Sequence, residues 1–229
     1  MRGSIPSFIQ ISDGKTHEVN VLDMLAPEAQ AFYLLDRGYT DFDRLHALHE
    51  AGSFFVIRAK RNLRFKRRYS QPVDRSATRV FCDQIGTLEI YYSRQAYPTA
   101  VRRVVVRDEN GKRIAFLTNN TSLAPEKIAE LYRLRWQVEL FFKWIKQHLR
   151  INAFFGTSEN AVKTQIRIAV ATYVLIAIVK KRAMLPHSRY ELLQILSLTM
   201  FETTPINQLL ATPARTSNDD SEPKQLVLL

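Results

Sequence analysis

Four side chains in the second half of the sequence have types and spacing suited to binding metal and phosphate. Glu139 lies between apolar neighbours, with Arg135 four residues before it and Lys146 seven residues after it. The pattern predicts one helix over 125–149, which would place these three residues and Tyr132 along one face. A half-buried carboxylate is costly unless it is paired or binds a metal. A salt-bridged helix surface explains the same spacing, so the helix alone leaves both interpretations open.

A second candidate acid, Asp36, follows the apolar run 31–35 and precedes a turn at Gly38. The run is typical of a central strand, and α/β folds bind ligands and metals at the carboxyl ends of such strands. The alternative interpretation is an aspartate that only caps the following turn.

The sequence is strongly basic, because 33 Lys and Arg outnumber 22 Asp and Glu and give a net charge of +11. Such an excess favours a polyanionic partner, most often nucleic acid, although basic enzymes and ribosome-associated proteins share it. The cations concentrate in an acid-free run, where we expect contact with a phosphate backbone from Arg58, Lys60, Arg61, Arg64, Lys66, Arg67 and Arg68. A solvated charged loop is the alternative for this run.

The first 57 residues alternate between strand and helix patterns, which is the order expected of an α/β sheet. Strands are predicted at 7–12, 31–35 and 53–57, with a short helix at 17–25. A further helix is predicted at 41–51, with Thr40 as its N-cap and Gly52 just beyond its end.

The patterns between residues 58 and 118 are β-rich. Strands are predicted at 86–92, 100–107 and 113–118, and a turn at 108–111 joins the last two into a hairpin. From residue 125 onward the patterns are helical, with further helices predicted at 160–184 and 188–201. The tail 211–229 has the composition of a disordered segment.

Cysteine content and hydropathy indicate the cellular compartment and the relation to membranes. Cys82 is the only cysteine, so no intrachain disulfide can form, which suits a reducing cytoplasm. The longest apolar stretch, 168–179, is too short to span a bilayer. We therefore expect it to form a buried helix, and we expect no membrane partner.

Two motifs carry a resemblance to a known family. The spacing of Tyr132, Arg135, Glu139 and Lys146 resembles the Tyr-Arg-Glu-Lys signature of DDE transposases of bacterial insertion sequences, in insertion-sequence family four. The stretch DRGYTDF, which begins at Asp36, is similar to that family's motif around its second catalytic aspartate. The resemblance covers roughly residues 3–185.

The resemblance implies an α/β fold with an incomplete ribonuclease H-like core. This core would comprise residues 1–57 and 119–184, and the β-rich insertion would comprise residues 58–118. A C-terminal helical segment at 185–210 and the disordered tail would follow.

The resemblance also implies a chemistry for the two acids. Asp36 and Glu139 would be catalytic and would be metal ligands, sharing two divalent ions, Mg²⁺ or Mn²⁺, with a third acid. Tyr132, Arg135 and Lys146 would contact DNA near the cleaved strand. The implied partners are double-stranded DNA at transposon ends, target DNA and a second copy of the chain in a homodimeric synaptic complex. The implied location is the bacterial cytoplasm, in association with the nucleoid.

The sequence departs from the family pattern in one respect. The family's first catalytic aspartate lies on the first strand of the core, whereas only Asp13 and Asp23 precede Asp36 here. Asp13 falls in a predicted turn and Asp23 in a predicted helix. We therefore expect that the first strands of the core are missing and that this chain alone does not cut DNA. The alternatives are a non-catalytic DNA-binding regulator derived from a transposase and a basic RNA-associated protein whose spacing is coincidental.

Overall fold

The computed structural model describes residues 5–6, 9–11, 18–149, 151, 153–199 and 208. These residues belong to two compact units, one formed by residues 12–136 and the other by residues 1–11 together with 137–228. Each unit is described by itself.

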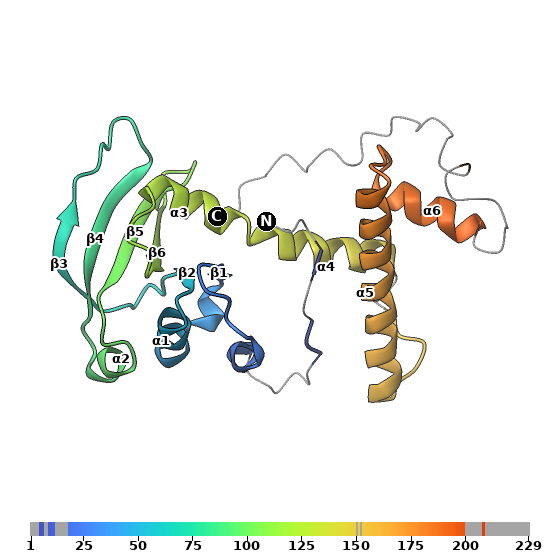
Figure 1. Ribbon diagram of the computed structural model, residues 1–229, viewed down its shortest axis with the longest axis horizontal. Helices are drawn as coiled ribbons and strands as arrows, with labels where there is room; N and C mark the ends of the chain where they lie inside the picture. The colour runs from blue at the N-terminus through green and yellow to red at the C-terminus, as the bar shows by residue number, and fades with distance from the viewer. Residues whose placement is uncertain are drawn as a thin grey trace. The chain divides into compact units, whose positions relative to one another are not determined.

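The first unit is built on one six-stranded sheet (Figure 1). The strands are β1 (Phe32–Leu35), β2 (Phe54–Arg58), β3 (Phe65–Gln71), β4 (Val80–Leu88), β5 (Val101–Arg107) and β6 (Arg113–Thr118). Their order in the sheet is β1-β2-β6-β5-β4-β3, in which β1 and β2 are parallel and the other neighbours are antiparallel. The predicted α/β class is confirmed. The division into a core and an insertion stays a prediction, and β6 pairs directly with β2.

Helices cover both faces of this sheet because its central strands are apolar on both sides. The helical elements of the unit are η1 (Glu18–Met24), η2 (Arg37–Tyr39), α1 (Phe42–Glu50), α2 (Tyr91–Ala96) and α3 (Pro125–Arg133). One core cluster joins α1 to the sheet through Leu45 and Leu117. The other joins α3 to the opposite face through Ile128 and Phe116.

The local signals that fix α1 differ slightly from those predicted. Asp41, rather than Thr40, is the N-cap, and its carboxylate accepts a hydrogen bond from the backbone N–H of Arg44 at 3.1 Å. Gly52 follows the helix with a φ of 72°, a left-handed conformation that favours glycine. The predicted helix at 17–25 is a 3-10 helix.

Two further sequence predictions are wrong. The strand predicted at 86–92 ends at Leu88, and α2 then begins at Tyr91. Tyr97, which follows α2, is buried in the core, whereas Tyr91 and Tyr92 in the first turn of α2 are exposed. The helix predicted over 125–149 is interrupted between α3 and α4 (Trp136–His148). The predicted strand at 7–12 lies partly outside the described residues, and 9–11 form no regular structure.

The second unit contains α4, α5 (Glu159–Arg182) and α6 (Arg189–Thr199). The rings of Phe141 and Tyr173, on α4 and α5, lie 4.8 Å apart, and Ile176 of α5 packs against Leu192 of α6. The predicted helices at 160–184 and 188–201 are therefore confirmed as far as they are described. The predicted disordered tail lies outside the described residues.

Helix α5 is long and apolar enough, by length and composition alone, to cross a membrane. A core helix of a soluble protein passes the same test, and Ala169, Tyr173 and Ala177 of α5 are buried in a cluster with α4. The expectation that the chain has no membrane partner stays a prediction.

Candidate active site

Asp36 lies directly after β1, at the carboxyl end of a parallel strand, where the sequence predicted it. Its Oδ1 accepts a hydrogen bond of 2.6 Å from the backbone N–H of Arg37, so Asp36 does cap the turn that follows. The cap uses one carboxylate oxygen, and the side chain is 47% exposed. Asp36 can therefore cap the turn and still accept a further ligand.

The second carboxylate oxygen of Asp36 faces Arg135. Its Oδ2 lies 3.6 Å from Nη1 of Arg135, whose side chain is 22% exposed. A partly exposed pair at this distance contributes at most about 1 kcal/mol to stability. A phosphate or a metal ion can therefore displace this contact at little cost.

Tyr132 completes this cluster from the last turn of α3. Its ring is buried against Phe116 at a centroid distance of 4.8 Å, and the guanidinium carbon of Arg135 lies 5.7 Å from the Tyr132 ring centroid. Burial raises the pKa of Tyr132, and the Asp36 carboxylate raises it further, whereas Arg135 and Arg58 oppose the shift. Tyr132 is therefore a neutral phenol at neutral pH, in the same electrostatic environment as Asp36.

The break between α3 and α4 changes how the signature residues are held. Leu134 and Arg135 form a turn in which the Arg135 N–H donates to the Tyr132 carbonyl at 3.1 Å, a tightened helix end. Arg135 is therefore a turn residue, and the predicted alignment on one face of a single helix is wrong. Glu139 and Lys146 lie in the first and last turns of α4, respectively.

Glu139 is half-buried and Lys146 is exposed, and both belong to the second unit. The assignment of Asp36 and Glu139 to one metal site therefore stays a prediction. Among the residues that the structure describes, no group of three or more His, Cys, Asp or Glu side chains is arranged to hold a metal ion.

The basic run is not a loop throughout. Arg58 ends β2, Lys60, Arg61 and Arg64 lie in the connection to β3, and the remaining three cations, Lys66, Arg67 and Arg68, are exposed on β3. Because β3 is an edge strand, these three charges also protect an open sheet edge against pairing with another chain. DNA contact by the run stays a prediction.

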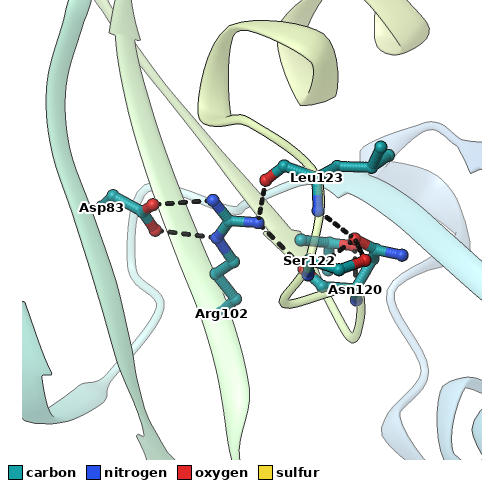
Figure 2. Close-up of polar contacts among 6 residues, drawn as sticks. Asp83, Arg102, Asn120, Ser122 and Leu123 are labelled. Atoms are coloured by element: carbon teal, nitrogen blue, oxygen red, sulfur yellow. Dashed lines mark hydrogen bonds and ion pairs between the residues drawn. The ribbon is translucent and has the colours of Figure 1, made fainter. Parts of the chain in front are cut away.

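A buried ion pair that the sequence analysis missed supports the segment leading into α3 (Figure 2). Arg102 donates from Nε and Nη2 to the two carboxylate oxygens of Asp83 at 2.8 and 2.7 Å. Its Nη1 donates to the carbonyls of Asn120 and Leu123 at 3.2 and 2.7 Å. Asp83 and Arg102 are each 1% exposed.

The Asn120 side chain continues this network. Its Oδ1 accepts hydrogen bonds from the backbone N–H groups of Ser122 and Leu123 at 3.2 and 2.9 Å. The loop before Pro125 is thereby fixed, and with it the start of the helix that carries Tyr132. The sequence gives a partial signal for this network: Asp83 is the one charged residue in the otherwise uncharged strand β4, whereas Arg102 is one of three arginines in β5.

The mixed sheet with helices on both faces, and an acid at the end of a parallel strand, is consistent with a ribonuclease H-like domain. The family described as "Transposase DDE domain" matches residues 2–175. The chain therefore belongs to the DDE transposases.

Relatives of the chain carry transposase names. A protein from Sinorhizobium fredii named as transposase y4zB is 34% identical over 176 residues, which cover 76% of this chain and 49% of that protein. A Geobacillus stearothermophilus protein named as a transposase for insertion sequence element IS5377 is 36% identical over 178 residues, which cover 76% of this chain and 45% of the relative. A Synechocystis protein named for element IS4SA is 27% identical over 182 residues, which cover 75% of this chain and 48% of the relative. The chain thus spans about half the length of each of these curated relatives.

Proposed function

We propose that this chain supplies two of the metal-binding carboxylates of a transposase, Asp36 and Glu139, together with side chains that contact DNA. The observation that carries the proposal is the cluster of Asp36, Tyr132 and Arg135 at the carboxyl end of β1. In this cluster, an accessible carboxylate lies beside a cation that is only weakly bound to it. The matching family signature supports the same roles and adds Lys146 as a further phosphate contact.

The side chains present fit a hard divalent ion such as Mg²⁺ or Mn²⁺. Asp36 retains free acceptor positions after it has capped Arg37, and carboxylate oxygens are the ligands that Mg²⁺ prefers. When bound, the ions would activate water or a 3′-hydroxyl and stabilise the leaving oxygen of a phosphodiester. Arg135 and Lys146 would bind the phosphate, whose negative charge increases in the transition state.

The activity proposed for the whole protein is cleavage and strand transfer of double-stranded DNA at transposon ends. It would act as a homodimer in a synaptic complex, in the bacterial cytoplasm and in association with the nucleoid. The 229-residue chain alone would not perform it, because neither aspartate that precedes Asp36 is a good candidate for the third acid. Asp23 is ion-paired with Arg44 at 2.6 Å, and Asp13 falls in a turn predicted from the sequence.

A plasmid-nicking assay tests this proposal. The purified chain is incubated with supercoiled DNA and Mg²⁺ or Mn²⁺, and the expected result is no metal-dependent nicking. Robust nicking that Glu139→Ala abolishes would show that this chain holds a complete site and would overturn the expected inactivity.

A binding assay separates the proposed contacts from non-specific attraction to a basic protein. Arg135→Gln and Lys146→Gln should each weaken duplex binding and lower the slope of log affinity against log salt by about one. Arg133→Gln is the matched control, because Arg133 is exposed at the end of α3 and has no assigned role. Equal losses in all three variants would contradict the assigned contacts.

A further inference from the structure

A hollow of about 370 Å³ lies against strands β4, β5 and β6 and the segment that follows β2. Uncharged side chains of the sheet line part of it, among them Phe81, Cys82 and Val105. Among the described residues, seven that line it are cations and none is acidic; the cations are Arg37, Arg58, Lys60, Arg61, Arg103, Lys112 and Arg113. We call this feature the basic hollow.

Strand alternation explains why arginines gather on this part of the sheet. On β5, Val104 and Val106 pack into the core cluster under α3, so Arg103 and Val105 point to the opposite face. Cys82 of β4 lies opposite Val105 in the register, and Val105 lies opposite Ala115 of β6. Cys82, Val105 and Ala115 therefore lie side by side on the face of the sheet that lines the hollow, and Arg103 lies on the same face.

The ring of Phe81 holds three guanidinium groups close together. The guanidinium carbons of Arg113, Arg75 and Arg107 lie 3.7, 4.8 and 5.4 Å from its centroid. Arg107 and Arg113 are also direct cross-strand partners, an arrangement that like charges disfavour. Attraction between the cations and the ring offsets part of that repulsion and leaves guanidinium N–H groups available for an anion.

Carboxylates do not neutralise the basic hollow. Among the described residues, none of its seven cations forms an ion pair with an acid, whereas Arg79 nearby pairs with Glu109 at 3.6 Å. Burial raises the pKa of Cys82, which lines the hollow, and Arg103 is the largest of the charges that oppose this shift. Arg75 and Arg113 also oppose the shift and Asp83 adds to it, so arginines contribute most of the charge that acts on Cys82 among the described residues.

We propose that the basic hollow binds the sugar–phosphate backbone of duplex DNA, as a second contact surface beside Asp36. The proposal rests on the proposed function in that DNA is taken as the substrate. The cations extend from Arg37, the residue after Asp36, to Arg113 on β6. A DNA backbone that contacts them would therefore pass close to Asp36. An isolated phosphate would not need cations spread over several strands.

The geometry favours phosphate contact over base recognition. Binding of single strands usually relies on exposed aromatic rings on which bases stack. Phe81 is the one aromatic residue that lines the hollow in the described part of the chain, and arginines already surround its ring. The hollow should therefore bind without regard to sequence, and salt should weaken the binding strongly.

The test is the salt dependence of duplex binding by the full chain, measured by fluorescence anisotropy with two short duplexes of unrelated sequence. The first variant is Arg103→Gln with Arg113→Gln on the strands. The second is Lys60→Gln with Arg61→Gln, which lie in an exposed turn and should leave folding intact. Each double variant should lower the slope of log affinity against log salt by about two, equally for both duplexes.

The matched control is Arg94→Gln with Lys127→Gln, which removes the same charge from exposed positions on α2 and α3. Its slope should equal that of the wild type. Equal slopes for the hollow variants and the control would overturn the proposal. Tighter binding of single-stranded DNA or RNA than of the duplex, lost in the same variants, would overturn the assignment to duplex DNA.

The assay also separates this proposal from the proposed function. A wild-type chain that binds no DNA would overturn both. A wild-type chain that binds DNA, with slopes unchanged in both hollow variants and reduced by Arg135→Gln, would overturn the basic hollow alone.

Discussion

Removing Arg102 should destabilise the first unit strongly, because it leaves a buried carboxylate without its partner. In Arg102→Met the apolar side chain fills much of the space but cannot donate to Asp83. The variant also removes the donors to the Asn120 and Leu123 carbonyls. The perturbation therefore tests whether this ion pair holds the loop that precedes α3.

The burial of this ion pair determines how much stability the variant should lose. Both partners are 1% exposed, and breaking such a buried pair from one side costs about 3–5 kcal/mol. The double variant Asp83→Leu with Arg102→Met removes both charges, so only the two carbonyls lose a partner, at about 1–3 kcal/mol each, and Arg102→Met alone carries the same loss. The two single variants together should therefore cost at least about 2 kcal/mol more than the double variant.

Urea unfolding followed by far-ultraviolet circular dichroism measures these costs. Tryptophan fluorescence is less suitable, because Trp136 and Trp144 lie in α4 rather than in the sheet. For a slope near 2 kcal/mol per molar urea, Arg102→Met should lower the midpoint by roughly 2 M. Hydrogen exchange should also show faster exchange of the amides in 119–133 in this variant.

Two results would refute this reasoning. One is a loss of less than about 1 kcal/mol in the free energy of unfolding of Arg102→Met, which is the contribution expected of a solvent-exposed ion pair. The other is strict additivity, in which the double variant costs as much as the two single variants combined. Arg102→Lys is a further control: it keeps the charge but lacks the planar fork, so its stability should be intermediate.

Three further predictions concern the strands and helices of the first unit. Gly86→Ala should cost roughly 2–3 kcal/mol in urea unfolding, because a Cβ there would lie 2.2 Å from the Lys66 carbonyl oxygen; a neutral result would contradict the close approach of β3 and β4. Asp41→Ala should lower the free energy of unfolding by about 1 kcal/mol, because α1 loses its N-cap. Asp41→Asn should keep most of the stability that the cap contributes, and equal losses in the two variants would argue against the cap. Burial raises the pKa of Tyr97 to about 12, so its contribution to stability is present below pH 10 and is lost as pH rises towards 12. Tyr97→Phe should flatten that part of the stability curve, and an unchanged alkaline slope would contradict the assignment.

Local sequence patterns predicted the elements whose signals are complete within a few residues. The strand predicted at 113–118 has the observed bounds, because its alternation follows a hairpin turn in which Gly111 adopts a φ of 76°. Helix α5 was predicted to within two residues at each end, since Ser158 caps its start and an apolar face runs along its length. Asp36 was correctly placed at the end of a strand, directly after an apolar run.

Features that depend on distant partners could not be predicted in this way. No glycine or proline marks the break at Leu134, which coincides with the contact of Arg135 with Asp36, 99 positions earlier. The pairing of Asp83 with Arg102 is likewise set by the register of β4 and β5. The spacing rule identified the candidate residues because it depends on their types, but it assigned them a single helix that the chain does not form.

The most direct test of the central claim, that Asp36 and Glu139 bind a divalent metal, is titration calorimetry of the full chain with Mn²⁺. We expect measurable binding by the wild type and a loss of affinity of at least about tenfold, or 1.4 kcal/mol, in both Asp36→Asn and Glu139→Gln. Asp43→Asn, at an exposed acid in the first turn of α1, should bind Mn²⁺ like the wild type. Unchanged affinity in Asp36→Asn and Glu139→Gln, or an equal loss in Asp43→Asn, would contradict the claim.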